Sequence, residues 1–346
     1  MQSVFTFSLP SVLFFAIMKG KRGRKENCRF MSYRESIRVV DTTLRDGGLV
    51  NDFKFSDDFV RALYKANLAA GVDYMEVGYR SSKTIFDASQ FGAWKFSEDE
   101  VISKVIGEVN PAIKLAVMAD VGRCDFKNDI RQKKESPISL IRVATYIHQV
   151  SDAIEMIEDA KEKGYEVSCN LMAISKATPS ELRVALDMIS KSNVDVIYVV
   201  DSFGSLYPEQ VRNFVKVYKE FAGKTGKKLG IHAHNNQQLA FANTIAACCD
   251  GVDWVDATYG GMGRGAGNCY MENLIGYLHN SKYDLLPVIQ FVEEHVKALK
   301  NSKDVWGFDI PYLLTGISNQ HPRAAISYIK EGRNDITSFF NELEKS

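Results

Sequence analysis

Eight apolar, β-branched segments alternate with amphipathic stretches along this chain, and this alternation sets the strongest limit on its fold. The expected strands cover residues 37–44, 72–79, 113–120, 140–147, 166–174, 194–201, 228–235 and 252–259. Several of them, such as the segment from Val196 to Val200, are almost wholly apolar. Such composition is typical of parallel strands that are covered on both faces.

The stretches between these strands carry the start and stop signals of helices. Thr178–Glu181 is a capping box with proline at the first helical position, and it predicts a helix that runs to Ser192. Ser56 opens another helix, which is expected to close at Gly71. Eight strand–helix units in a chain of 346 residues predict an α/β fold of the (β/α)8 TIM-barrel type.

The chain is expected to divide into three parts. Residues 32–284 hold the predicted barrel. Residues 285–346 change in character, with a helix expected over 288–299, a break over 302–311 and further helical material to Ser346. We expect this small helical extension to pack on the barrel and to offer a surface to a second copy or to a partner enzyme. A plain stability cap is the alternative.

Residues 1–31 form the third part, where an apolar run (12–18) precedes a basic cluster (19–25). A secretory signal has the opposite order, and the run is too short to span a bilayer. We expect a poorly ordered tail or an over-extended start, with Met31 or Met18 beginning the functional chain. A membrane-surface anchor is the alternative.

The net charge and the cysteine spacing indicate which binding partners and which cellular compartment to expect. The net charge is zero, so the sequence predicts no nucleic-acid partner. The six cysteines show no Cys-x-x-Cys spacing, and Cys248 and Cys249 are adjacent in an apolar helical stretch. They are expected to be reduced core thiols of a cytoplasmic protein.

Two short polar segments at the ends of predicted strands contain the candidate catalytic residues. In an extended strand, residues i and i+2 face the same way, so His232 and His234 can direct both imidazoles at one ion. The string from Asp41 to Gly48 adds a carboxylate beside a guanidinium, where an apolar run gives way to glycine. Two imidazoles and one carboxylate with open positions predict a catalytic divalent-metal site. The alternative is two solvated histidines and an ordinary Arg–Asp pair.

Other polar residues support a catalytic face at the carboxyl ends of the strands. Asp120 and the pair Asp201–Ser202 also end predicted strands. After the last strand, residues 258–268 hold five glycines, without the lysine of a Walker A loop or the position of a dinucleotide fingerprint. At the start of a helix, such a loop can contact a substrate carboxylate or an acyl-carrier phosphate. Asn268 would then lie within reach of the metal or its surroundings.

These strings resemble a known family. Asp41-Thr-Thr-Leu-Arg-Asp-Gly, His232-Ala-His-Asn and the glycine loop look like those of metal-dependent TIM-barrel lyases and synthases. That group includes hydroxymethylglutaryl-CoA lyase, isopropylmalate and homocitrate synthases, and 4-hydroxy-2-oxovalerate aldolase. Arg142-Val-Ala-Thr, Asn170-Leu-Met-Ala and Val196–Ser202 bring the likeness closest to the aldolase. The likeness covers residues 37–276.

The resemblance implies a role for each matching residue. The metal ligands would be Asp46, His232 and His234, with Mn²⁺ favoured and Mg²⁺ or Zn²⁺ as alternatives. Arg45 would hold the enolate oxygen of a 2-oxo acid, a catalytic and a substrate-binding role. Ser202 would meet the substrate carboxylate. The position of Asn268 in the glycine loop, independently of the resemblance, adds it to the predicted substrate-binding residues.

The departures from the family pattern concern proton transfer. Leu49 stands where the aldolases have their general-base histidine, and Tyr146 stands where they have another histidine. The lyase cysteine of the glycine loop and the glutamine of many synthases are also missing. Candidate replacements for the base are Tyr79, Tyr146, His148 and His321, with a structural role as the alternative for each. Of these, His321 is placed in the predicted catalytic set.

The resulting prediction is a metal-dependent aldolase or lyase that makes or cleaves a C–C bond next to a 2-oxo acid, with pyruvate enolate as intermediate and an aldehyde as the other partner. An acyl-CoA-dependent Claisen synthase is the first alternative, although a long regulatory domain is missing. A catalytically reduced relative that binds metal and ligand is the second, because the proton-transfer residues are lost.

Overall fold

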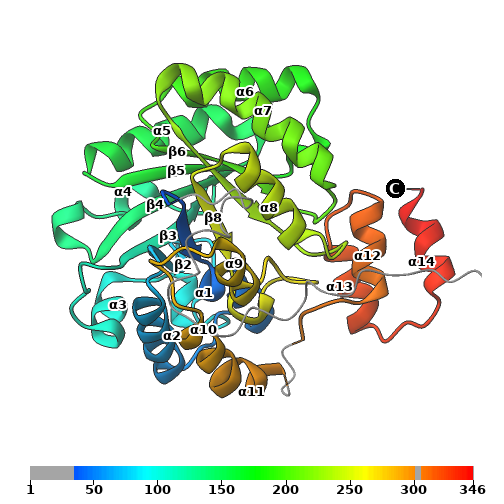
Figure 1. Ribbon diagram of the computed structural model, residues 1–346, viewed down its shortest axis with the longest axis horizontal. Helices are drawn as coiled ribbons and strands as arrows, with labels where there is room; N and C mark the ends of the chain where they lie inside the picture. Colours follow the sequence, from blue (N-terminus) through cyan, green and yellow to red (C-terminus); the bar gives the residue numbers. More distant parts are fainter. Residues whose placement is uncertain (1–34, 301–304, 346) are drawn as a thin grey trace, which may run out of the picture. The chain divides into compact units, whose positions relative to one another are not determined.

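The computed structural model describes residues 35–300 and 305–345. Its centre is a closed barrel of eight parallel strands in chain order, with β8 paired to β1 (Figure 1). The strands are β1 (Arg38–Asp41), β2 (Tyr74–Tyr79), β3 (Lys114–Asp120), β4 (Ile138–Thr145), β5 (Glu166–Leu171), β6 (Val196–Asp201), β7 (Lys228–Ala233) and β8 (Trp254–Ala257). The predicted (β/α)8 barrel is therefore confirmed.

Helices follow the strands and cover the outside of the barrel (Figure 1). They are α1 (Thr43–Asn51), α2 (Asp57–Ala70), α3 (Asp99–Ile106), α4 (Phe126–Asp129), α5 (Val150–Glu162), α6 (Pro179–Lys191), α7 (Pro208–Thr225), α8 (Ala240–Asp250) and α9 (Met271–Leu278). Short 3₁₀ turns lie between them: η2 (Ala93–Lys95), η3 (Lys133–Glu135), η4 (Ile147–Gln149), η5 (Ile174–Lys176) and η6 (Tyr259–Gly261).

The predicted helix ends are present. Thr178 and Glu181 form the capping box of α6, and the Ser56 side chain accepts the N–H of Phe59 at the start of α2. Gly71 closes α2 with φ of 76°, a conformation that favours glycine.

Alternate residues of each strand face either the barrel interior or the helices. One apolar layer fills the interior with Val40, Tyr74, Ala116, Leu140, Val196, Tyr198, Val200 and Trp254. Gly230 lies beside this layer, and a Cβ there would press into the ring of Tyr198. Glu76, Arg142 and Asp256 each follow a member of this layer by two residues, so they form a charged layer above it.

The first strand is shorter than predicted. It ends at Asp41 rather than Leu44, because the Asp41 carboxylate accepts the Thr43 N–H at 2.9 Å and the Thr43 hydroxyl at 2.5 Å, which turns the chain. Arg45 and Asp46 therefore lie in the first turn of α1, not on the end of a strand. Most other strands are also shorter than predicted, whereas β4 keeps its predicted length but lies two residues earlier in the chain.

The carboxyl-terminal extension is helical, as expected. The helix predicted over 288–299 consists of α10 (Leu285–Phe291), a π-helical turn η7 (Val292–Val296) and α11 (Lys297–Lys300). The predicted break ends two residues early, because α12 (Ile310–Ile317) begins where the Asp309 side chain accepts the Ile310 N–H. The last helices are α13 (Arg323–Lys330) and α14 (Ile336–Leu343).

The extension is attached to loops at the carboxyl ends of the barrel strands. Helices α12, α13 and α14, drawn in orange and red in Figure 1, pack their buried side chains around Ala266 of the glycine loop. Asn319 accepts a hydrogen bond from the Ser205 hydroxyl at 2.9 Å and donates to the carbonyl of Ser175 at 3.0 Å. These contacts bring the extension to the face that carries the predicted site.

Three further expectations concern cysteines, membranes and the amino-terminal end. Cys249 is exposed, so it is not the core thiol that its apolar neighbours suggested, whereas Cys248 is buried. Within 35–300 and 305–345, no helix has the length and apolar character needed to cross a bilayer. The tail predicted over 1–31 lies outside the described residues.

Candidate active site

Three buried side chains converge at the carboxyl ends of the barrel strands. Asp46 comes from the first turn of α1, His232 from β7, and His234 from the bridge that follows β7. Each offers one ligand atom, and these atoms lie within 4.8 Å of one another. Oδ2 of Asp46 is 3.5 Å from Nε2 of His232 and 3.7 Å from Nε2 of His234.

The donor atoms of this group fit a divalent cation. Nε2 of His232, which lies 3.5 Å from Oδ2 of Asp46, is buried and has no hydrogen-bond partner in the described part of the chain. Oδ1 of Asn268 is in the same situation. Buried polar atoms are normally paired, so these two orphaned atoms in residues next to Asp46 indicate a missing partner. Nitrogen and oxygen donors together suit an ion such as Mn²⁺, Mg²⁺ or Zn²⁺.

The local electrostatics favour the ligand forms of Asp46 and His234, whereas hydrogen bonds with Asp256 and Asp46 raise the pKa of His232 against the effect of its burial. Burial by itself raises the pKa of Asp46, but the Arg45 guanidinium and the two imidazoles hold it well below its usual range. Burial also lowers the pKa of His234 well below the ordinary value. An ionised carboxylate and a neutral imidazole are the forms that bind metal ions.

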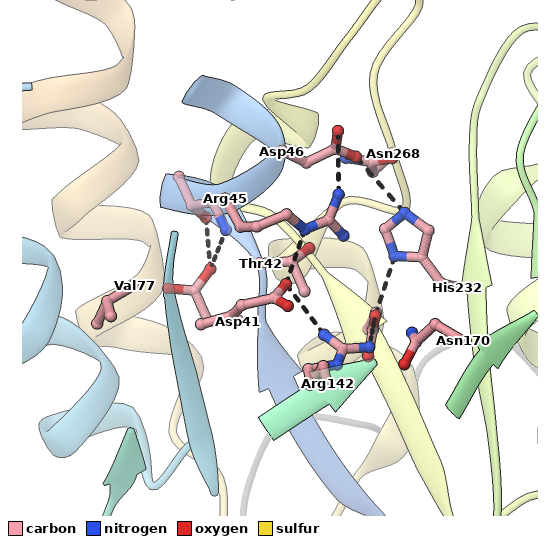
Figure 2. Close-up of polar contacts among 12 residues, drawn as sticks. Asp41, Thr42, Arg45, Asp46, Val77, Arg142, Asn170, His232 and Asn268 are labelled. Atoms are coloured by element: carbon pink, nitrogen blue, oxygen red, sulfur yellow. Dashed lines mark hydrogen bonds and ion pairs between the residues drawn. The ribbon is translucent and has the colours of Figure 1, made fainter. Parts of the chain in front are cut away.

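A closed ring of polar contacts surrounds the site, and we call it the charge ring. Its members, in order, are Asp46, Arg45, Glu76, Arg142, Asp256 and His232. The two arginine links to Glu76 measure 2.9 Å from Arg45 and 3.0 Å from Arg142. Figure 2 shows how Arg142 connects this network to His232. All six members are buried.

The sequence analysis missed three members of the charge ring: Glu76, Arg142 and Asp256. Arg142 was noticed only as part of a family motif. A signal was available, because each of them is a charged residue in the middle of a mostly apolar predicted strand. A charged residue in such a strand is buried only when it is paired.

Arg45 is the cation next to the triad Asp46–His232–His234. Its Nη1 lies 3.4 Å from Oδ1 of Asp46, and its Nε donates to Glu76. Its guanidinium carbon is also 6.0 Å from the centre of the Tyr79 ring. The ion pairs with Asp46 and Glu76 therefore hold the guanidinium beside the triad. Figure 2 shows Arg45 next to Asp46.

Asn268 connects the glycine loop to the triad. Its amide nitrogen donates to Oδ2 of Asp46 at 2.5 Å (Figure 2). Gly263 makes this approach possible, because a Cβ at Gly263 would collide with the Asn268 amide. Most of the loop's glycine and asparagine N–H groups bind inside the protein, which leaves fewer of them for an anion than the sequence suggested.

Ser202 directly follows β6, and His321 lies in the loop between α12 and α13. The Ser202 hydroxyl accepts the N–H of Ala173 at 2.9 Å. His321 stands beside the neighbouring Phe203, with ring centres 5.8 Å apart, and its Nδ1 accepts the N–H of Arg323. Burial, with Arg264 and Arg323 nearby, lowers the pKa of His321 to about 3, so its imidazole is neutral. Among the described residues, His321 makes no hydrogen bond with the triad.

The other candidate bases differ in position. Tyr79 is buried near Arg45, and burial raises the pKa of its hydroxyl. Tyr146 and His148 are exposed and stack on each other, with ring centres 5.8 Å apart. Leu49 lies three residues after Asp46 on α1, so the two side chains share a helix face. Position 49 therefore lies on the same face of α1 as Asp46, although leucine has no group that transfers protons.

The protein is a closed (β/α)8 barrel, and it holds a buried Asp–His–His group at the carboxyl ends of its strands. These two features place it in the class of barrel proteins with a candidate divalent-metal centre. The pattern of the HMGL-like family matches residues 36–303. The chain therefore belongs to the HMGL-like family.

Relatives and a solved structure agree with this assignment. The chain is 35% identical over 240 residues to a 4-hydroxy-2-oxovalerate aldolase of Thermus thermophilus, covering 69% of this chain and 68% of the relative. It is 32% identical over 251 residues to an oxaloacetate decarboxylase of Mycobacterium tuberculosis, covering 71% of each chain. The N-terminal domain of a candidate aldolase from Bacteroides vulgatus superposes with a TM-score of 0.75 at 29% identity, covering 85% of this chain and 97% of that domain.

Proposed function

We propose that this protein is a divalent-metal-dependent aldolase or lyase that makes or cleaves a C–C bond next to a 2-oxo acid. The observation that carries the proposal is the Arg45 guanidinium, held against Asp46 by Glu76. The names of two relatives, 4-hydroxy-2-oxovalerate aldolase and oxaloacetate decarboxylase, support it, since both describe the breaking of a C–C bond in a 2-oxo acid. The shared intermediate would be the enolate of pyruvate or of a similar acid.

Asp46, His232 and His234 would hold the ion in this proposal, with Mn²⁺ favoured by the mixed donor set. A bound divalent ion supplies Lewis-acid polarisation of the substrate carbonyl. Asp256 would hold His232 in the tautomer with a free Nε2.

Arg45 would stabilise the negative charge that develops on the enolate oxygen. A guanidinium fits a planar carboxylate–enolate better than an ammonium does. Because Glu76 and Asp46 already fix its orientation, Arg45 needs little rearrangement during the reaction.

We assign substrate binding and proton transfer to three further residues. Ser202 would meet the substrate carboxylate, and Asn268 would keep Asp46 in place and contact the substrate through Oδ1. His321 would transfer a proton through Nε2, because its Nδ1 already accepts a hydrogen bond.

A second candidate function is metal and ligand binding without C–C cleavage. Leu49, in place of the family's base, favours it. Exchange of the methyl protons of pyruvate in deuterated water, followed by NMR with and without Mn²⁺, separates the candidates. Metal-dependent exchange that is lost in the Arg45→Lys variant supports the enzyme. No exchange in a parent protein that retains Mn²⁺ favours the binding protein.

A further inference from the structure

The buried cationic side chains at the catalytic face differ in whether they pair with a carboxylate. Arg45, Arg80 and Arg142 each pair with a buried carboxylate. Lys95, at the end of η2, is only 6% exposed, and its ammonium makes no ion pair or hydrogen bond in the described part of the chain. A buried charge without a partner is costly, so Lys95 needs an explanation.

Four aromatic rings surround the Lys95 ammonium. Their centres lie 4.1 Å (Phe86), 4.8 Å (Tyr79), 5.2 Å (Phe53) and 5.6 Å (Phe91) from Nζ. We call these four residues the aromatic box. Ring faces attract a cation, but they give its three N–H groups no strong acceptor. The box therefore holds the charge and leaves its hydrogen-bonding capacity unused.

The charged groups nearest to the box leave an excess of positive charge. Burial lowers the pKa of Lys95 to about 8, Asp120 at the end of β3 opposes this shift, and Arg123 adds to it. A pKa near 8 leaves the amine mostly protonated at neutral pH. Asp120 is shared with Arg123, whose Nη1 lies 3.8 Å from its Oδ2. Two cations therefore face one carboxylate in this sector.

The ring of Tyr79 lies near both Lys95 and Arg45, so it gives the position of Lys95 relative to the candidate active site. Its ring centre is 4.8 Å from Nζ of Lys95 and 6.0 Å from the guanidinium carbon of Arg45. The ammonium is thus one aromatic ring away from the group that would hold the enolate. This spacing suits the far end of a short substrate chain better than the carbon atoms that react.

We propose that Lys95 binds a second carboxylate at the far end of the substrate, so that the preferred substrates are 2-oxo dicarboxylates. The inference rests on the proposed function, because it places the 2-oxo acid end at Arg45 and the triad. A second carboxylate supplies the acceptors that the three N–H groups lack. It also neutralises the excess charge of the sector formed by Lys95, Arg123 and Asp120.

Binding measurements on the full-length protein loaded with Mn²⁺ test this without any turnover. The two probes are 2-oxoglutarate and 2-oxopentanoate, which share chain length and the 2-oxo acid end and differ only in the second carboxylate. Calorimetry should give at least about tenfold tighter binding of 2-oxoglutarate. Equal affinities in the parent protein would overturn the proposal.

Variants test whether the preference for 2-oxoglutarate over 2-oxopentanoate depends on the Lys95 side chain. Lys95→Met should bring the ratio of the two affinities close to one, and Lys95→Arg should keep part of it. Lys83→Met is the matched control, because Lys83 also lies over an aromatic ring, 5.6 Å from the centre of Phe96, but pairs with Glu98 on the surface. The control should keep the parent ratio, and a parent-like ratio in Lys95→Met would contradict the proposal.

A pH series on the parent protein covers the case in which Lys95→Met does not fold. The titratable or charged groups that face Lys95 are Tyr79, Asp120 and Arg123. Affinity for 2-oxoglutarate should fall as the pH rises through about 8, relative to 2-oxopentanoate, because the amine loses its charge. A ratio that stays constant through this range contradicts the role of Lys95.

The proton-exchange assay keeps the two proposals apart. If the protein prefers the dicarboxylate through Lys95 but shows no proton exchange, the Lys95 site is supported and the proposed enzyme function is overturned. If it shows proton exchange but no preference for the dicarboxylate, the enzyme function is supported and the Lys95 site is overturned.

Discussion

Nδ1 of His232 lies 2.9 Å from Oδ2 of Asp256, and this contact decides which ring nitrogen faces Asp46. Burial raises the pKa of Asp256, but Arg142 and His232 lower it below its usual value, so the carboxylate is ionised and accepts the Nδ1 proton. In the neutral imidazole, Nε2 then keeps its lone pair on the side of Asp46, whose Oδ2 is 3.5 Å away. The imidazole is therefore arranged as a metal ligand by the protein itself.

The first prediction concerns metal content. His232→Ala and His234→Ala should lose the ion on dialysis, and Asp256→Asn should weaken its binding about 10–100-fold because the tautomer is no longer fixed. Elemental analysis after dialysis measures this. His148→Ala removes an exposed histidine and should match the parent. Full metal content in both triad variants would show that these residues are not the ligands.

Replacing Arg45 tests the stabilisation of the enolate. Arg45→Lys should keep the fold and the metal but reduce proton exchange by about 10²–10³-fold, the usual cost of removing an oxyanion donor. Lysine cannot contact Glu76 and Asp46 with one planar group. Arg61→Lys, in an exposed pair with Asp58, is the control. An unchanged exchange rate in Arg45→Lys would rule out this role.

Position 49 should control aldol cleavage. The parent protein should be slow on 4-hydroxy-2-oxopentanoate with Mn²⁺, because Leu49 cannot take the proton of the C4 hydroxyl. Leu49→His should be faster, since a positioned base contributes about 10²–10⁴-fold. Steady-state assays compare the two proteins, with Leu49→Gln as a polar control. A fast parent enzyme that gains nothing from the histidine would contradict this prediction.

The charge ring should also support stability. Arg142→Met leaves Glu76 and Asp256 without their common partner inside the barrel, and we expect a loss of about 3–5 kcal/mol in the free energy of unfolding. Urea titration provides the measurement. Lys191→Met breaks only an exposed pair with Asp187 and should change stability by less than about 1 kcal/mol. Similar losses in the two variants would argue against the charge ring.

A pH dependence follows from His321. Its folded-state pKa of about 3 lies below the ordinary value of 6.5, so the unfolded chain binds a proton that the folded chain refuses. The stability that depends on the neutral imidazole is complete above pH 6.5 and is lost as the pH falls toward 3. In His321→Gln, the melting temperature should fall less steeply across this range. Parallel curves for the two proteins would mean that the imidazole titrates normally.

The fold could be predicted because each element had its own local signal. Apolar β-branched runs marked the strands, and the capping box at Thr178 marked α6. The end of the first strand was wrong, since the pattern of apolar residues continues to Leu44 while the Asp41 side chain turns the backbone after Asp41. Side chain to backbone contacts of this kind are not visible in hydrophobic periodicity.

The site was less predictable, because it depends on contacts between distant strands. His232 and His234 carried a spacing signal, and the structure brings them to Asp46 as expected. The roles of Ser202, Asn268 and His321 stay predictions. Lys95 gave no signal, since a lysine in a loop normally reads as a solvated surface residue, and only the tertiary fold collects the four rings around it.

Because the charge ring is closed, it limits which amino-acid substitutions the protein can accept during evolution. Each member contacts two others, so a single replacement leaves two charged groups without one of their neighbours inside the barrel. Substitutions in the ring should therefore occur in compensating pairs, and relatives that differ at Glu76 should differ at Arg45 or Arg142 as well. Co-variation between these positions would be the evolutionary record of a barrel interior that tolerates only exchanges of matched charge.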